Sequence, residues 1–159
     1  MALAGAAFAV WGAGCGRRRK IVAAGGLVLA ALLLWPLRPA PDRTMLPPGA
    51  ETYSSARLSA LRAERRPVFV DASAAWCITC QLNEEAALSR PRVRAAFGRR
   101  GIVFLAADWT GRDPAIGRLL QAHGRAGVPL YLYYAPGAAT PKVLPQILTE
   151  DTVLNAIAR

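Results

Sequence analysis

The chain has 159 residues, of which 53% are hydrophobic, and this share is high for a wholly soluble domain. One domain with an appendage fits this length, since single domains commonly run to roughly 100–200 residues. The net charge of +10 comes mostly from arginines that are scattered and follow no groove-reading motif, which argues against a nucleic-acid-binding protein. We therefore expect part of the apolar excess to lie in a membrane.

An uncharged segment, residues 21–37, has the composition of a transmembrane helix. It has the sequence IVAAGGLVLAALLLWPL, and about 17 residues is the lower end of what crosses a bilayer core. The basic run GRRRK at 16–20 precedes it, so the positive-inside rule places the N-terminal side in the cytoplasm and everything after Leu37 outside it. A buried soluble helix is disfavoured because the segment is apolar on all faces. A cleaved signal peptide is disfavoured by the poor cleavage site at 37–41.

The predicted membrane segment spans residues 1–37 and is followed by a linker. Residues 1–15 are apolar but too short to cross alone, and they fit the end of a preceding transmembrane helix. The chain is then either single-pass or the tail of a multi-pass protein. Residues 38–52 are rich in proline and have no apolar period, so we predict a semi-rigid tether. The folded domain is expected at 53–159.

Helices and strands alternate in the predicted domain. Cap residues and apolar spacing predict helices over 54–65, 77–88, 91–97, 113–123 and 149–158. Runs of β-branched and aromatic residues predict strands over 68–71, 102–107, 129–134 and 143–144. The order βαβ followed by ββα predicts a three-layer α/β domain whose first strands are parallel.

Two cysteines, Cys77 and Cys80, are separated by two residues at the start of a predicted helix that follows a strand. Thiol–disulfide exchange needs a thiolate, and a helix N-terminus stabilises this anion. We therefore predict that Cys77 is the nucleophile and that Cys80 resolves the mixed disulfide. Zinc is disfavoured, because Cys15 and the lone His123 supply no second ligand pair. Copper(I) bound by the two thiolates and a purely structural disulfide stay open as alternatives.

The stretches VFVDASAAWCITCQ and GVPLYLYY resemble the thioredoxin superfamily. More narrowly, WCITCQLNE, ADWTGRDPAI and GRAGVPLYLYY are similar to the C-terminal periplasmic domain of DsbD-type thiol:disulfide interchange proteins, over roughly residues 65–159. The resemblance implies a thioredoxin-like α/β/α sandwich with a central mixed sheet, preceded here by the transmembrane helix. It also implies a protein-disulfide reductase at the bacterial inner membrane. Such a domain takes electrons from a membrane-embedded dithiol and passes them to periplasmic thiol–disulfide proteins, including factors of cytochrome c maturation or copper resistance.

The resemblance also implies roles for residues around the two cysteines. Asp71 matches an acid buried near them and Glu84 a second acid one turn beyond Cys80, and both would tune the thiol pKa values and handle protons. The plain alternatives are a loop cap for Asp71 and a solvated helix residue for Glu84. Val128 and Pro129 match the family's cis-proline loop, which contacts the partner's chain. Trp76 would shield the disulfide and offer a docking surface.

The direction of electron flow and the extent of the protein stay open at this point. An oxidase or isomerase would differ from a reductase only in redox potential, and Ile78 and Thr79 shape that potential in a way the sequence does not quantify. We predict no cofactor and no metal. Family members carry an amino-terminal domain and a larger membrane unit. The chain is therefore either a fragment of such a protein or a tethered domain that takes its electrons from another polypeptide.

Overall fold

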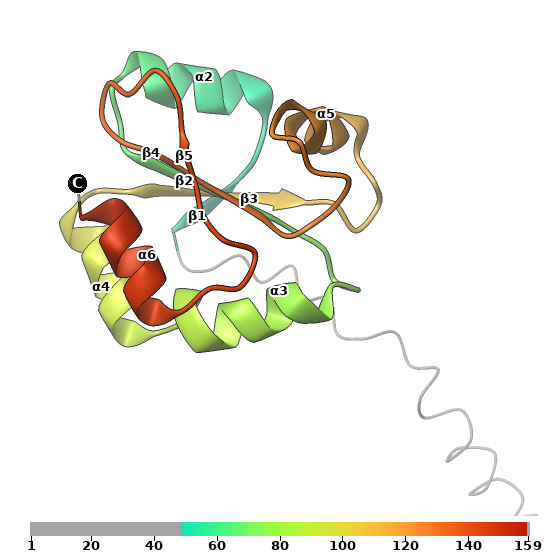
Figure 1. Ribbon diagram of the computed structural model, residues 1–159. Coiled ribbons are helices and arrows are strands. Elements are labelled where there is room, and N and C mark those ends of the chain that lie inside the picture. The colour runs from blue at the N-terminus through green and yellow to red at the C-terminus, as the bar shows by residue number, and fades with distance from the viewer. Residues whose placement is uncertain (1–48, 159) are drawn as a thin grey trace, which may run out of the picture. The chain divides into compact units, whose positions relative to one another are not determined.

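A five-stranded mixed sheet forms the centre of the domain in a computed structural model that describes residues 49–158 (Figure 1). The strands are β1 (Ala50–Thr52), β2 (Val68–Ser73), β3 (Val103–Asp108), β4 (Leu130–Tyr134) and β5 (Lys142–Val143). They lie in the order β1-β3-β2-β4-β5. Strands β1, β3 and β2 are parallel, β4 is antiparallel to β2, and β5 is antiparallel to β4. The predicted parallel pairing of the first long strands is confirmed.

Helices cover both faces of this sheet. They are α2 (Ser55–Ala63), α3 (Ile78–Asn83) with its π-helical continuation η2 (Glu84–Leu88), α4 (Pro91–Arg99), α5 (Pro114–Ala122) and α6 (Glu150–Ile157). Helices α2 and α5 pack on one face, where Leu61 and Leu120 join a core cluster, while η2, α4 and α6 pack on the other around Phe69 and Val153 (Figure 1). The result is an α/β domain with one apolar core on each side of the sheet.

The helix starts follow from local chemistry. The side chains of Ser54, Asp113 and Thr149 each accept a hydrogen bond from a backbone amide in the first turn of α2, α5 and α6. Proline occupies the first turn of α4 and of α5, where its missing amide hydrogen costs nothing. The predicted helices are therefore confirmed to within a few residues at each end.

Two strand predictions need correction. Strand β2 does not end at Asp71 but continues to Ser73, because it pairs with β3 on one side and β4 on the other along this length. This two-sided pairing overrides the low strand propensity of aspartate. The sequence did not predict β1, whose three residues fall within the expected linker and pair with β3. So short an edge strand carries no periodic pattern.

The expected membrane segment, 1–37, lies outside the described residues. Within residues 49–158 no helix combines the length and the apolar character that crossing a membrane requires.

Candidate active site

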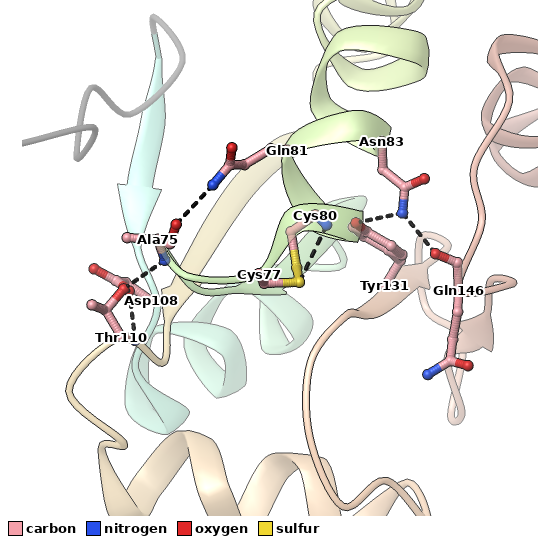
Figure 2. Close-up of a disulfide and its surroundings, with 9 residues drawn as sticks. All are labelled: Ala75, Cys77, Cys80, Gln81, Asn83, Asp108, Thr110, Tyr131 and Gln146. Atoms are coloured by element: carbon pink, nitrogen blue, oxygen red, sulfur yellow. Dashed lines mark hydrogen bonds between the residues drawn. A yellow bond between two sulfur atoms is a disulfide. The ribbon is translucent and has the colours of Figure 1, made fainter. Parts of the chain in front are cut away.

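The two cysteines lie at the carboxyl end of β2 and form a disulfide with a Cα–Cα distance of 5.3 Å (Figure 2). Cys77 is the N-cap of α3, and its Sγ accepts a hydrogen bond of 3.2 Å from the backbone amide of Cys80. Both side chains are almost fully buried and contact Ala74 and Val128. The predicted helix start at Cys77 is confirmed, and η2 extends this helix to Leu88.

The position of Cys77 matters for its chemistry. The partial positive charge of a helix is concentrated at its N-terminus, and the amide of Cys80 already points at the Cys77 sulfur. Both effects favour a thiolate at Cys77 once the disulfide is reduced. Cys80 is the third residue of α3 and lies farther from the end of the helix. The arrangement supports Cys77 as the attacking sulfur.

Asp71 is the acid that the sequence predicts to handle protons near the cysteines. Its side chain is 8% exposed, and its Oδ1 has no hydrogen-bond partner. Burial, with a smaller contribution from the negative charge of Glu84, raises the pKa of Asp71 to about 7. A carboxyl group with this pKa can both accept and release a proton near neutral pH.

Glu84 begins η2 and has its own partners. Its Oε1 accepts a hydrogen bond of 2.8 Å from Ser89 Oγ and lies 3.9 Å from an Arg94 nitrogen. Its charge nevertheless contributes to the raised pKa of Asp71. Glu84 is thus a partly exposed helix residue whose charge acts on Asp71, and its role in the reaction stays a prediction.

Asn83 is a buried polar residue that sequence reasoning missed. Its side chain is 2% exposed, and its Nδ2 donates to Tyr131 Oη at 3.0 Å and to the Gln146 carbonyl at 2.6 Å (Figure 2). Its Oδ1 accepts from the Leu148 amide at 2.9 Å. Asn83 thus joins α3 to β4 and to the segment before α6. The signal in the sequence that could have revealed Asn83 is its position three residues after Cys80, which places both side chains on the same side of a helix.

The predicted cis-proline segment lies beside the cysteines. The Val128–Pro129 peptide bond is cis, and Val128 packs against the cluster that holds Cys77 and Cys80. The structure therefore brings together two segments that are about 50 residues apart in the sequence.

Trp76, the residue before the first cysteine, is 51% exposed and is held by the loop after β3. Its Nε1 donates to the Thr110 carbonyl at 3.3 Å, and the Ala75 amide donates to Thr110 Oγ1 at 2.9 Å. The Thr110 hydroxyl in turn donates to Asp108 Oδ1. The loop belongs to the stretch ADWTGRDPAI, and the sequence predicted no role for Asp108, Trp109 or Thr110.

Three large apolar side chains on α3 and in the segment before α6 are exposed. Ile78 and Leu82, one turn apart on α3, are 73% and 60% exposed. Ile147 is also exposed, and it lies between Gln146 and Leu148, whose backbone groups bind the Asn83 side chain.

Among the described residues no group of three or more His, Cys, Asp or Glu side chains could hold a metal ion. His123 is the C-cap of α5, and burial lowers its pKa. Cys15 lies outside the described residues.

Fold and site together define a domain for thiol–disulfide exchange. A family model described as thioredoxin-like matches residues 50–136, and the chain belongs to this family. Among its relatives are thiol:disulfide interchange proteins named DsbD. Protein DsbD 1 of Pseudomonas aeruginosa is 35% identical over 82 residues, which are 52% of this chain and 14% of that protein. DsbD of Salmonella paratyphi A is 28% identical over 128 residues, which are 73% of this chain and 22% of that protein.

Solved structures point to the same relatives. The oxidised C-terminal domain of DsbD from Neisseria meningitidis superposes with a TM-score of 0.53 at 26% identity, covering 67% of this chain and 95% of that domain. A thioredoxin from Thermus thermophilus shares the fold with a TM-score of 0.52 at 20% identity. The chain therefore contains a thioredoxin-like exchange domain related to the C-terminal domain of DsbD. It spans only a small part of the length of the curated relatives it matches.

Proposed function

We propose that this protein is a membrane-anchored, periplasmic protein-disulfide reductase that passes electrons through Cys77 and Cys80 to partner proteins. The observation that carries the proposal is the CxxC disulfide at the N-terminus of α3, in a domain that is related to that of DsbD and buries Asp71 on the preceding strand. Residues 21–37 are the proposed anchor, 38–49 the tether and 50–159, which include strand β1, the working domain.

The first chemical step belongs to Cys77. In the reduced domain its thiolate attacks one sulfur of the partner's disulfide, forming a Cys77–partner disulfide while the partner's second sulfur leaves as a thiolate. The helix N-terminus and the Cys80 amide favour the attacking anion. The near-complete burial of Cys77 means that the partner must dock closely before attack.

The second step resolves this mixed disulfide. Cys80 loses its thiol proton to the Asp71 carboxylate and its sulfur attacks Cys77 Sγ. The Cys77–partner bond breaks, and the electron pair leaves with the partner's sulfur. The partner has gained two electrons and the domain is left with the Cys77–Cys80 disulfide. The Asp71 pKa of about 7 suits this base, and Glu84 helps to keep it there.

Docking uses the exposed surface around the disulfide. Trp76 and the Val128–Pro129 segment flank the cysteines, and the exposed Ile78 and Leu82 extend the apolar area on α3. The relation to DsbD suggests the periplasm as the compartment. The proposed electron donor is a membrane-embedded dithiol, and the acceptors are periplasmic thiol–disulfide proteins. The tether lets the domain move between them.

Trapping tests the proposed exchange. A Cys80→Ser variant cannot complete the second step, so it should accumulate mixed disulfides through Cys77 that reductant releases. A Cys77→Ser variant and a Cys77→Ser/Cys80→Ser variant are the matched controls and should trap nothing in the same periplasmic extract. Equal yields from the Cys80→Ser variant and the double variant would count against the proposed exchange.

A further inference from the structure

Arg112 places a positive charge on the aromatic residues beside the disulfide. Its Cζ lies 5.9 Å from the ring centroid of Trp76 and 5.4 Å from that of Trp109. The two indole rings are themselves 6.1 Å apart. Guanidinium groups within about 6 Å of an indole face are attracted by the ring's quadrupole. The guanidinium is thus held in place although the residue is exposed.

The loop that carries Arg112 is attached to the redox segment. Strands β2 and β3 are parallel, so the loops that follow them leave the same edge of the sheet. Thr110 binds both Ala75 and Trp76, and the Trp109 amide donates to the Ser73 carbonyl at 2.8 Å. These contacts fix the Arg112 charge on the Trp76 side of the disulfide.

The Arg112 guanidinium has no carboxylate as an ion-pair partner in the part of the chain that the structure describes. The two acids nearest in sequence are engaged elsewhere: Asp108 accepts hydrogen bonds from Thr110, and Asp113 caps α5 through the Ala115 amide. Arg112 also has a backbone φ of +56°, in the left-handed region that a non-glycine residue seldom adopts. Among the described residues, Arg112 is thus a cation without an ion-pair partner, in an uncommon conformation at the edge of the reactive site.

We propose that Arg112 is a specificity-determining residue that binds a carboxylate of the partner protein next to the partner's reactive cysteine. The domain then prefers cysteines flanked by acidic residues. This inference rests on the proposed exchange function. It adds that the preferred partner is negatively charged next to its reactive cysteine. A guanidinium that stacks on an aromatic face still presents N–H donors at its edge, and these match the two oxygens of a carboxylate.

The acids of the redox helix do not cancel this preference. Glu84 is engaged with Ser89 and Arg94, and Glu85 is exposed on η2, beyond Cys80. Arg112 instead lies against Trp76, which precedes Cys77. Arg112 therefore lies at the other end of the redox motif from these two acids.

Peptide disulfides test the preference directly. Three synthetic peptides carry one cysteine flanked on both sides by glutamate, by glutamine or by lysine, and each is oxidised to its own symmetric disulfide. The full chain, in a non-ionic detergent and with Cys77 and Cys80 reduced, reacts with each. Either sulfur of the peptide then releases the same thiol, and the second-order rate is followed by tryptophan fluorescence. Two peptide thiols and one protein disulfide are the balanced products.

Two variants separate local recognition from general attraction. Arg112→Gln removes the proposed contact, while Arg65→Gln removes an exposed arginine that also has a positive φ, of +54°, but precedes β2 at the opposite end of that strand. Because the whole chain carries +10, non-specific attraction to the acidic peptide would fall equally in both variants. A local site predicts a loss only in Arg112→Gln.

The expected result is a rate for the glutamate peptide about two- to fivefold above that for the glutamine peptide, lost in Arg112→Gln and kept in Arg65→Gln. In the unaltered chain the preference should shrink as salt rises from about 20 mM to about 500 mM, which tests the proposal even if the variant folds poorly. Equal rates for all three peptides, or equal losses in the two variants, would overturn the inference while leaving exchange intact. No reaction with any of the three peptides would overturn the proposed function as well.

Discussion

Asp71 and Tyr131 are direct partners in the antiparallel pairing of β2 with β4, and both side chains are buried. Residues opposite one another in such a pair project to the same face of the sheet, so the carboxyl and the phenol share one layer of the core. Burial raises the pKa of Tyr131, and the charge of Asp71 raises it further. Ionisation of Asp71 is therefore less favourable in this layer than in water.

Replacing Asp71 by asparagine should change how stability depends on pH. The folded pKa of about 7 lies above the ordinary value of 3.8, so the protonated carboxyl contributes its full stability only below about pH 4, where the unfolded chain is protonated too. Its contribution is lost as pH rises through 7, by up to about 1.4 kcal/mol per pH unit. Urea unfolding of the oxidised protein should show Asp71→Asn gaining stability relative to the original chain between pH 5 and pH 8.

The exposed Asp151 provides the matched control for this experiment. An Asp151→Asn variant makes the same chemical change on the surface, so its stability difference from the original chain should stay nearly constant over that pH range. A constant difference for Asp71→Asn as well would mean that Asp71 ionises normally in the folded state.

The same substitution should slow resolution of the mixed disulfide. With Cys77 linked to a thionitrobenzoate group, attack by Cys80 releases a coloured thiolate whose appearance can be followed by stopped flow. General base catalysis of this kind contributes about 10²-fold or more, so Asp71→Asn should lose roughly that factor at neutral pH. The rate in the original chain should rise with pH through about 7, and this inflection should be missing from the variant.

Glu84 should act on the reaction only through Asp71. Because its charge contributes to the raised pKa of Asp71, Glu84→Gln should move the inflection of the resolution rate to lower pH. The inflection should remain above the ordinary carboxyl range, since burial is the larger cause. Glu85→Gln, on the adjacent and exposed residue, should leave the profile where it is. A profile unmoved by Glu84→Gln would contradict the electrostatic link.

Asn83 should contribute more to the free energy of unfolding than an exposed asparagine does. Asn83→Ala removes three hydrogen bonds and leaves the buried Leu148 amide without its acceptor. We expect a loss of about 2–3 kcal/mol in the free energy of unfolding, measured by urea titration. Asn155, exposed on α6, is the control, and Asn155→Ala should cost well under 1 kcal/mol in the same assay. Similar losses in the two variants would show that the buried network adds little.

Local signals in the sequence were sufficient for most of the elements. Ser54, Asp113 and Thr149 cap the helices that they were expected to start, because a cap depends only on residues three positions away or fewer. The CxxC pair at a strand–helix junction was likewise visible from residues 68–88. The central mixed sheet followed from the resemblance and from the order of the elements.

Long-range contacts account for what the sequence left out. Strand β1 exists through its pairing with β3, more than 50 residues away, and three isolated residues show no pattern. The role of Asn83 depends on Tyr131 and Gln146, and that of Arg112 on Trp76. Such pairs meet only after the sheet has formed, so spacing along the chain does not reveal them.

The reduction potential of the Cys77–Cys80 pair tests the central claim most directly. It can be measured by equilibrating the full chain with dithiothreitol or glutathione redox buffers and counting the free thiols of this pair. A protein-disulfide reductase supplied with electrons from the cytoplasmic side predicts a value near that of thioredoxin, about −270 mV. A value towards about −120 mV, typical of a strong oxidant, would contradict the proposed direction of electron flow.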